Sequence, residues 1–517
     1  MCQNIWSYAE MDRKISSSHT LETKPTIGYC LTRVKRNTPA GENPPRRTPP
    51  GFAGALSFLR SRLSLESSIR SMRFRGFGLR LSFLLAILLA GCSGPRLLMP
   101  TPSVYLDAHA ETFEKLDPAL KTTEVPLFFF TDRQPETDES GGLRYGSARS
   151  PSLAFGRVTV DLGRDATWEE LVEASRTQRR VKPFALEITK IEEIVRNPPT
   201  PLPYTEIDGQ IVTPANLSEQ MAKSREVFRR TLARQLALTP RKEVFIYVHG
   251  YHNSFDDAAF AMAELWHFLG RIGVPVVYTW PAGYPGLFGY TYDRESSEFT
   301  VYHLRELLAL LASSPEVEKI HVIAHSRGTD VALNAVRELM IEARASGADP
   351  RKSLKIHNFI LAAPDLDLQV ASQRVVGDYL SSGVNRFTVY ASPNDKAIGI
   401  AAGLFASPRG RLGTLGVEEL PDELTSVLEY SGANLAIVNF EPVSDIKYSS
   451  DDRYGHSYFR NEPTVSSDLV LMIREDLDPG PPGRPLTSLG HKFWRIPPGY
   501  PATQLRDTSA AHSTVGD

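Results

Sequence analysis

The pattern of hydrophobic and polar positions changes near residue 241. From there on, short and nearly continuous apolar runs alternate with segments in which apolar residues recur every three to four positions. Strands buried on both faces have such continuous runs, so the alternation predicts an α/β fold: a mostly parallel sheet covered by helices on both faces. The expected strands lie at residues 244–248, 276–280, 320–325, 359–363, 387–391 and 435–440.

Upstream of residue 241 the apolar runs are more widely spaced. Runs at residues 125–131, 155–162 and 184–191 predict strands, and residues 215–237 form a polar, helix-prone stretch. We therefore expect a strand-rich N-terminal extension over residues 121–240, in front of an α/β domain at residues 241–476. The Pro- and Gly-rich residues 477–517 predict a peripheral C-terminal tail.

The N-terminal region shows a third pattern. Residues 1–71 are rich in Ser, Pro and Arg without a helical or strand period, so we expect disorder there. In residues 72–91, arginines precede an apolar run that is short for a bilayer span, an order typical of a secretory signal peptide rather than a buried helix. Because signal peptides lie at the N-terminus, Met72 is the expected start, and residues 1–71 would be a non-native upstream extension.

The apolar run ends in Leu89-Ala-Gly-Cys92, which resembles a bacterial lipobox. That resemblance implies cleavage before Cys92, a diacylglyceryl group on its sulfur, and a tether over residues 92–120. The expected location is therefore a bacterial cell envelope, with the chain anchored to a membrane through Cys92. Ser93, rather than an aspartate, follows the cysteine, which favours the outer over the inner membrane.

Composition narrows the classes of function. The 517-residue chain has a formal net charge of -2 and no basic stripe with interleaved aromatic residues, so we expect no nucleic-acid partner. Its cysteines are Cys2, Cys30 and Cys92, which leaves the body of the chain without a thiolate metal site or an internal disulfide. We expect neither a metal nor an organic cofactor.

One strand ends in a sequence that suggests nucleophilic chemistry. Residues 323–328 read Ile-Ala-His-Ser-Arg-Gly, close to the G-x-S-x-G turn that exposes a nucleophilic serine between a strand and a helix. Ala324 replaces the first glycine and adds one methyl group, which the turn can tolerate, while Gly328 keeps the second small position. Ser326 is therefore a candidate nucleophile; the alternative is a serine that only caps a helix.

A nucleophilic serine needs a base and a group that orients the base, in the order Ser, Asp/Glu, His. Asp395 ends the turn after the second strand beyond Ser326, at the carboxyl edge where α/β sites lie. Asp365 and Asp367, one strand earlier, are alternative acids, and any of the three could simply cap a turn. His456, after the last expected strand, is the candidate base; its alternative is an ordinary surface histidine.

The oxyanion of an acyl-transfer reaction needs two backbone N–H donors. One is expected from Arg327, which follows the nucleophile. The other is expected from Tyr251, after the His249-Gly250 pair that follows the first strand of the domain. Gly250 would let the backbone approach the substrate oxygen closely. His249 and His325 are expected to pack beside these turns rather than to react.

Taken together, these motifs resemble a bacterial esterase/lipase-like α/β-hydrolase family long described as a domain of unknown function. The resemblance covers about residues 125–475 and includes Trp280-Pro-Ala-Gly283, Tyr290-Thr-Tyr-Asp293 and Ser392-Pro-Asn-Asp395. It implies the α/β-hydrolase fold and a Ser-Asp-His triad, without a known substrate. Members usually have His-Gly-Tyr-Asn after the first strand, whereas here His252 intervenes between Tyr251 and Asn253.

The expected function is therefore a serine hydrolase that cleaves carboxylic esters of small molecules or lipids through an acyl-enzyme on Ser326. A thioesterase or peptidase could use the same residues. A different class of function is a catalytically silent hydrolase fold that serves as an envelope binding or scaffold lipoprotein. Residues 280–292 and 399–415 are candidates for a wall or lid of the substrate pocket.

Overall fold

The computed structural model describes residues 95–501 except 108–109, 287, 405–406, 408, 420–424, 427, 429–431, 433 and 442–453. The described residues belong to a unit of the chain that begins at Gly94. The expected upstream extension, the expected signal peptide and Cys92 lie outside them. Among the described residues, no helix has both the length and the apolar character needed to cross a membrane.

The described strands form one large sheet in the order β12-β13-β11-β10-β9-β8-β6-β7-β1-β2-β3. In this order, all neighbouring strands between β13 and β1 pair in parallel. The pairs β1·β2, β2·β3 and β12·β13, at the two ends of the sheet, are antiparallel. The strands are β1 (Glu124–Thr137), β2 (Leu143–Asp161), β3 (Glu187–Arg196), β6 (Glu243–Val248), β7 (Val274–Thr279), β8 (Lys319–His325), β9 (Ile356–Ala362), β10 (Arg386–Ala391), β11 (Leu435–Asn439), β12 (Thr487–Gly490) and β13 (Phe493–Arg495). A separate hairpin pairs β4 (Thr205–Ile207) with β5 (Gln210–Val212).

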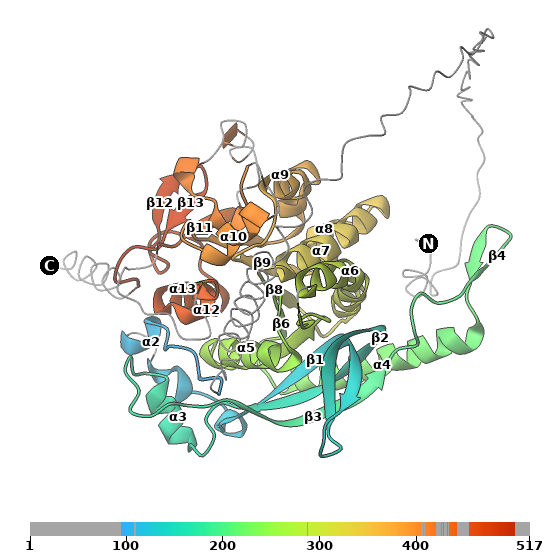
Figure 1. Cartoon of the computed structure of the whole chain (residues 1–517), viewed down its shortest axis with the longest axis horizontal. Coiled ribbons are helices and arrows are strands. Elements are labelled where there is room, and N and C mark those ends of the chain that lie inside the picture. The colour runs from blue at the N-terminus through green and yellow to red at the C-terminus, as the bar shows by residue number, and fades with distance from the viewer. Residues whose placement is uncertain are drawn as a thin grey trace, which may run out of the picture. The chain divides into compact units, whose positions relative to one another are not determined.

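Helices cover both faces of this sheet, as the sequence predicts. Alternate residues of β6 belong to two different apolar clusters: Ile246 packs with residues of α4, α6 and α7, and Tyr247 packs with residues of α5 and α13. Figure 1 shows these helices around the strands. The helices are α2 (Val104–Asp107), α3 (Trp168–Ala174), α4 (Ala215–Ala237), α5 (Phe255–Phe268), α6 (Gly289–Ser313), α7 (Gly328–Ala345), α8 (Pro350–Ser353), α9 (Leu368–Ser372), α10 (Lys396–Leu404), α12 (Tyr458–Asn461) and α13 (Pro463–Ile473).

The expected N-terminal extension is part of the main sheet. β1 runs parallel to β7, with Phe128 opposite Val276, and the β1–β2–β3 ribbon continues outward from there (Figure 1). The expected third strand lies slightly later than the apolar run suggested, at Glu187–Arg196, because the ladder with β2 continues into polar residues. Backbone pairing, rather than apolar side chains, thus sets the ends of these strands.

Two segments expected to be peripheral are packed against the domain. Residues 95–107, expected to be a tether, place Met99 in the core, and its N–H donates to the buried carboxylate of Glu264 at 2.6 Å. Arg96 pairs with the same carboxylate at 2.8 Å. In the expected C-terminal tail, β13 pairs with β11 and buries Phe493. Both segments lack a long apolar run, so their packing is visible only in three dimensions.

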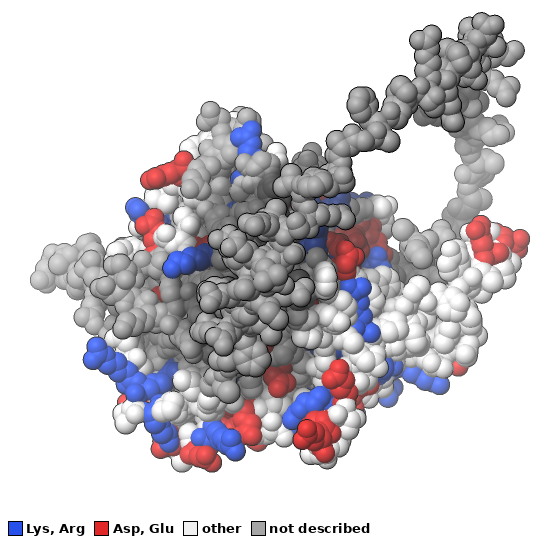
Figure 2. Space-filling view, in the orientation of Figure 1, with Lys and Arg blue, Asp and Glu red and all other residues white. Residues whose placement is uncertain are grey.

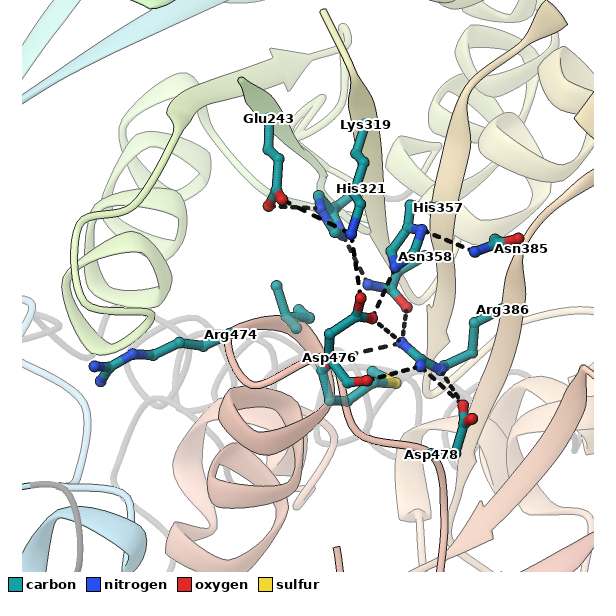
Figure 3. Close-up of polar contacts among 12 residues, drawn as sticks. Glu243, Lys319, His321, His357, Asn358, Asn385, Arg386, Arg474, Asp476 and Asp478 are labelled. Atoms are coloured by element: carbon teal, nitrogen blue, oxygen red, sulfur yellow. Dashed lines mark hydrogen bonds and ion pairs between the residues drawn. The ribbon is translucent and has the colours of Figure 1, made fainter. Parts of the chain in front are cut away.

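At the amino-terminal edge of the parallel strands, a polar network joins the sheet to the segment after α13 (Figure 3). The Arg386 guanidinium donates to Asn358 Oδ1 at 2.9 Å, which orients the Asn358 amide so that its Nδ2 donates to His321 Nδ1 at 2.8 Å. His321 Nε2 then donates to Glu243 at 3.2 Å. Asp476 pairs with Arg386 at 3.0 Å and accepts a hydrogen bond from His357 Nε2 at 2.7 Å. This edge is opposite the one that carries Ser326, so we assign the network a structural role.

Candidate active site

Ser326 lies in a sharp turn between β8 and α7, with a φ of 53°. That left-handed backbone is unfavourable for a residue with a Cβ, and it is typical of a nucleophile elbow. The turn is fixed on both sides of the residue. The N–H of Ser326 donates to the Ala362 carbonyl at 3.0 Å, and the Thr329 hydroxyl donates to the Ser326 carbonyl at 2.6 Å. Neighbouring backbone and side-chain groups therefore hold the strained conformation.

Two glycines allow the close approach that this elbow requires. A Cβ on Gly328 would lie 2.2 Å from the His249 carbonyl oxygen, and a Cβ on Gly250 would lie 2.7 Å from Ser326 Cβ. Neither contact leaves room for a side chain. Ala324, by contrast, lies fully buried in β8 between Val248 of β6 and Leu361 of β9. The first small position of the elbow therefore accepts a methyl group, whereas Gly328 has no space for one.

The candidate base and acid lie together. His456 Nδ1 is 2.7 Å from Asp395 Oδ2, and the other oxygen of Asp395 accepts the Ile398 N–H at 3.0 Å. The side chain of Asp395 is fully buried at the carboxyl end of β10. A carboxylate that accepts from Nδ1 fixes the proton there and leaves Nε2 of a neutral imidazole as the proton acceptor.

His456 also packs against the elbow. Its ring lies 4.7 Å from the ring of His325, the residue before Ser326, and His325 Nε2 is 3.3 Å from the His456 carbonyl oxygen. Burial, together with the charge of His456, holds the pKa of His325 well below its usual value. His325 is thus a neutral packing partner, consistent with the structural role expected for it.

The alternative acids have other partners. Asp365 pairs with Arg411, and both side chains are buried. Asp367 caps α9 and accepts the N–H groups of Gln369 and Val370. The structure therefore brings Asp395 to the candidate base, and it engages Asp365 and Asp367 in other contacts.

The loop after β6 is held by His249, which is fully buried. Its ring stacks on Trp280 at a centroid distance of 5.0 Å, its Nε2 accepts the Trp280 N–H at 3.0 Å, and its carbonyl accepts the indole N–H at 2.8 Å. Burial, and then the charge of Arg133, lowers the pKa of His249 to about 3. His249 is therefore a neutral structural residue.

Two charged residues that the sequence analysis did not assign to the site anchor the same loop. Arg133, buried in β1, donates to the carbonyls of Asn253 at 2.8 Å and Ala282 at 2.9 Å. Asp293, buried in α6, accepts the N–H groups of His252 at 3.1 Å and Gly283 at 2.9 Å. The only sequence signal for Asp293 was its place in the Tyr290-Thr-Tyr-Asp293 motif; Arg133 had none.

The inserted His252 bears on the oxyanion donor. His252 has a φ of 60°, and its N–H is used by Asp293, so it does not face a substrate. Within the described residues, the N–H groups of Tyr251 and Arg327 have no hydrogen-bond acceptor. These are the two donors expected for the oxyanion. The described residues contain no group of three or more His, Cys, Asp or Glu side chains placed to hold a metal ion.

Residues 224–474 match the model of a family described as alpha/beta hydrolase of unknown function (DUF900). A similar solved structure is that of a lipase-esterase related protein from Clostridium acetobutylicum ATCC 824. It is 10% identical, the match covers 46% of this chain and 96% of that one, and the TM-score of 0.24 is too low to inform the site. A comparison with curated proteins finds no match. Residues 224–474, which contain the elbow and most of the parallel sheet described above, thus match an α/β-hydrolase family and have the α/β-hydrolase fold.

Proposed function

We propose that this protein is a serine hydrolase that cleaves carboxylic esters through an acyl-enzyme on Ser326. The observation that carries the proposal is the 2.7 Å contact between His456 Nδ1 and Asp395 Oδ2, with the His456 ring packed on His325, the residue before a serine held at a φ of 53°. An oriented imidazole next to a strained, small-residue-flanked serine is the arrangement that activates a hydroxyl nucleophile.

In the proposed reaction His456 accepts the hydroxyl proton of Ser326 as the serine oxygen attacks the ester carbonyl. The N–H groups of Arg327 and Tyr251 stabilise the oxyanion, and Asp395 stabilises the imidazolium that forms. The protonated His456 then gives its proton to the departing alcohol. Water, deprotonated by His456, attacks the acyl-enzyme and releases the acid and free Ser326.

The experiment uses p-nitrophenyl esters of increasing acyl chain length and residues 93–517, with Ser326→Ala as the control. Ester cleavage that is lost in Ser326→Ala supports the proposal, because the oxyanion donors alone give only weak catalysis. A protein that cleaves no ester and whose Ser326 is not labelled by a fluorophosphonate would instead fit the silent binding or scaffold lipoprotein. A thioesterase or peptidase would label at Ser326 and prefer a thioester or peptide.

We further propose that the chain is anchored in a bacterial envelope through a lipid on Cys92. The lipobox-like Leu89-Ala-Gly-Cys92 supports this proposal. Incorporation of a labelled fatty acid into the wild-type protein and not into Cys92→Ser is the expected result. Membrane fractionation of the same pair then distinguishes the outer from the inner membrane.

A further inference from the structure

A cavity of about 290 Å³ lies between α6, the start of α7, α9 and the segment around Arg411. This volume is close to that of a small-molecule binding pocket, about 300 Å³ or more. Its lining is mainly charged: four arginines and four carboxylates contribute to it. A cavity with this lining differs from the apolar channel that a long acyl chain requires.

The cavity adjoins the proposed nucleophile. Arg327, which lines it, follows Ser326 directly, and Asp365, also in the lining, donates its N–H to the Ser326 carbonyl at 3.3 Å. Tyr290 connects it to the loop of the proposed oxyanion donor, because its ring lies 5.0 Å from that of Tyr251. A substrate whose ester lies at Ser326 can therefore extend into this space.

The carboxylates of the lining are largely engaged by protein donors. Asp365 pairs with Arg411, and Asp367 accepts two N–H groups of α9. Asp330 is shared by two guanidinium groups, those of Arg327 at 2.8 Å and of Arg374. The fourth, Glu298, is exposed and lies 3.9 Å from Arg327.

The side chains of Arg294, Arg327 and Arg374 have more N–H donors than the described protein acceptors use. Arg327 uses Nε on Ser297 and Nη2 on Asp330, and Arg374 uses Nη1 on Asp330. Arg294 has no ion pair within the described residues. Since each guanidinium carries five N–H groups, this wall presents more donors than the protein's acceptors occupy. An anionic group with several acceptor oxygens, such as a carboxylate or a phosphate, is the natural complement.

The excess is one of N–H donors and not of formal charge, since four carboxylates balance the four arginines of the lining. On the face drawn in Figure 2, described Lys and Arg side chains are interspersed with Asp and Glu, and the formal net charge of the chain is -2.

A second, mainly apolar cavity lies beneath α9 and is bounded by Leu368, Val375 and Leu415. It measures only about 50 Å³, far below a typical ligand pocket of about 300 Å³.

We propose that the substrate of this hydrolase carries an anionic group, a carboxylate or a phosphate, that binds Arg294, Arg327 and Arg374 while its ester lies at Ser326. That the bound molecule is a substrate rests on the proposed function. That it carries an anionic group rests on the cavity alone. It predicts a preference for acidic esters over neutral esters of equal length.

The test measures binding separately from turnover, by calorimetry on Ser326→Ala. The probes are mono-methyl adipate, which carries a carboxylate, and dimethyl adipate, its neutral counterpart. We expect the anionic probe to bind at least about tenfold more tightly, the effect of one or two charge-assisted hydrogen bonds. Arg294→Gln with Arg374→Gln should abolish that preference, whereas Arg337→Gln, an arginine of α7 that pairs with Asp378, should leave it intact.

A third probe, monomeric dihexanoyl phosphatidic acid, distinguishes the source of the anion. Arginine-dependent binding of this probe alone would indicate a phosphate on the alcohol side, and binding of the adipate monoester would indicate an acyl-side carboxylate. If neither anionic probe binds more tightly than the neutral diester, or if the preference survives the double substitution, the inference is overturned. The binding measurement on Ser326→Ala does not depend on turnover. A wild-type protein without esterase activity would therefore contradict the proposed function and still leave the preference for the anionic probe measurable.

Discussion

His456 Nδ1 lies 2.7 Å from Asp395 Oδ2, although 61 positions separate the two residues along the chain. The pairing joins the turn after β10 to a loop between β11 and α12. Neither group acts on the substrate alone: the carboxylate fixes the imidazole tautomer, and the imidazole takes the proton. The first prediction concerns this pair.

Asp395→Asn should lower kcat by about 10⁴ while leaving the fold intact, because an amide can hold the wrong tautomer of His456. Asp367→Asn is the matched control, since asparagine caps a helix as well as aspartate does. Steady-state kinetics on a p-nitrophenyl ester, with circular dichroism as a folding check, measure both variants. Equal losses in the two variants would contradict the assignment of Asp395 as the acid.

The two small positions of the elbow should respond differently to substitution. Gly328→Ala places a Cβ only 2.2 Å from the His249 carbonyl oxygen, so we expect a loss of about 1–3 kcal/mol in the free energy of unfolding, together with lost activity. Ala324→Gly should change activity little, because it restores the usual small residue. Urea unfolding of both variants provides the comparison, and a fully stable, active Gly328→Ala would refute the packing argument.

Asp293 should act as a positioning residue through the loop that carries Tyr251. Asp293 Oδ2 accepts the N–H groups of His252 and Gly283, and Oδ1 accepts that of Tyr284, so Asp293→Asn, which keeps one acceptor oxygen, cannot satisfy both sides of the loop. We expect kcat to fall by about 10- to 100-fold with a smaller change in KM, since a misplaced oxyanion donor costs transition-state binding. Loss of stability without a selective loss of kcat would show that Asp293 supports only the fold.

Buried histidines should make stability fall in mild acid. Burial, partly offset by Glu243, lowers the pKa of His321 from 6.5 to about 4. The unfolded chain therefore binds a proton that the folded chain does not, so this contribution is complete above about pH 6.5 and is lost as the pH falls towards 4. At about 1.4 kcal/mol per unit, the loss from His321 is about 3 kcal/mol.

His321→Gln isolates this effect, because a glutamine amide can still donate to Glu243 but does not titrate. We expect its melting temperature to depend less on pH between 6.5 and 4 than that of the wild-type protein. Differential scanning calorimetry across this range provides the measurement. Parallel profiles for the two proteins would mean that His321 is not buried in its neutral form.

Much of the fold could be predicted from local pattern. The apolar runs at β6, β8 and β10 marked the parallel strands. Ser254, followed three positions later by Asp257, has the spacing of a capping box, and the structure has one at the start of α5. These signals are local because continuous burial and helix capping are set by neighbouring residues. The order of Ser326, Asp395 and His456 pointed to residues that the structure places around one sheet edge.

The remaining features depend on contacts between distant segments. Arg133 lies in a strand whose sequence does not show that its guanidinium reaches the loop at Asn253. Met99 is buried in the core, and its N–H donates to Glu264, 165 positions away. β12 and β13 are too short to stand out in the sequence, and the edge of β11 pairs with β13 through the backbone. No local periodicity encodes such partners.

Covalent labelling tests the central claim most directly. The protein would be treated with a fluorophosphonate, its intact mass measured, and the modified peptide sequenced. We predict one adduct per chain, on Ser326, that is absent in Ser326→Ala and strongly slowed in Asp395→Asn. An adduct on a different residue, or none in a folded wild-type protein, would contradict the assignment of Ser326 as the nucleophile.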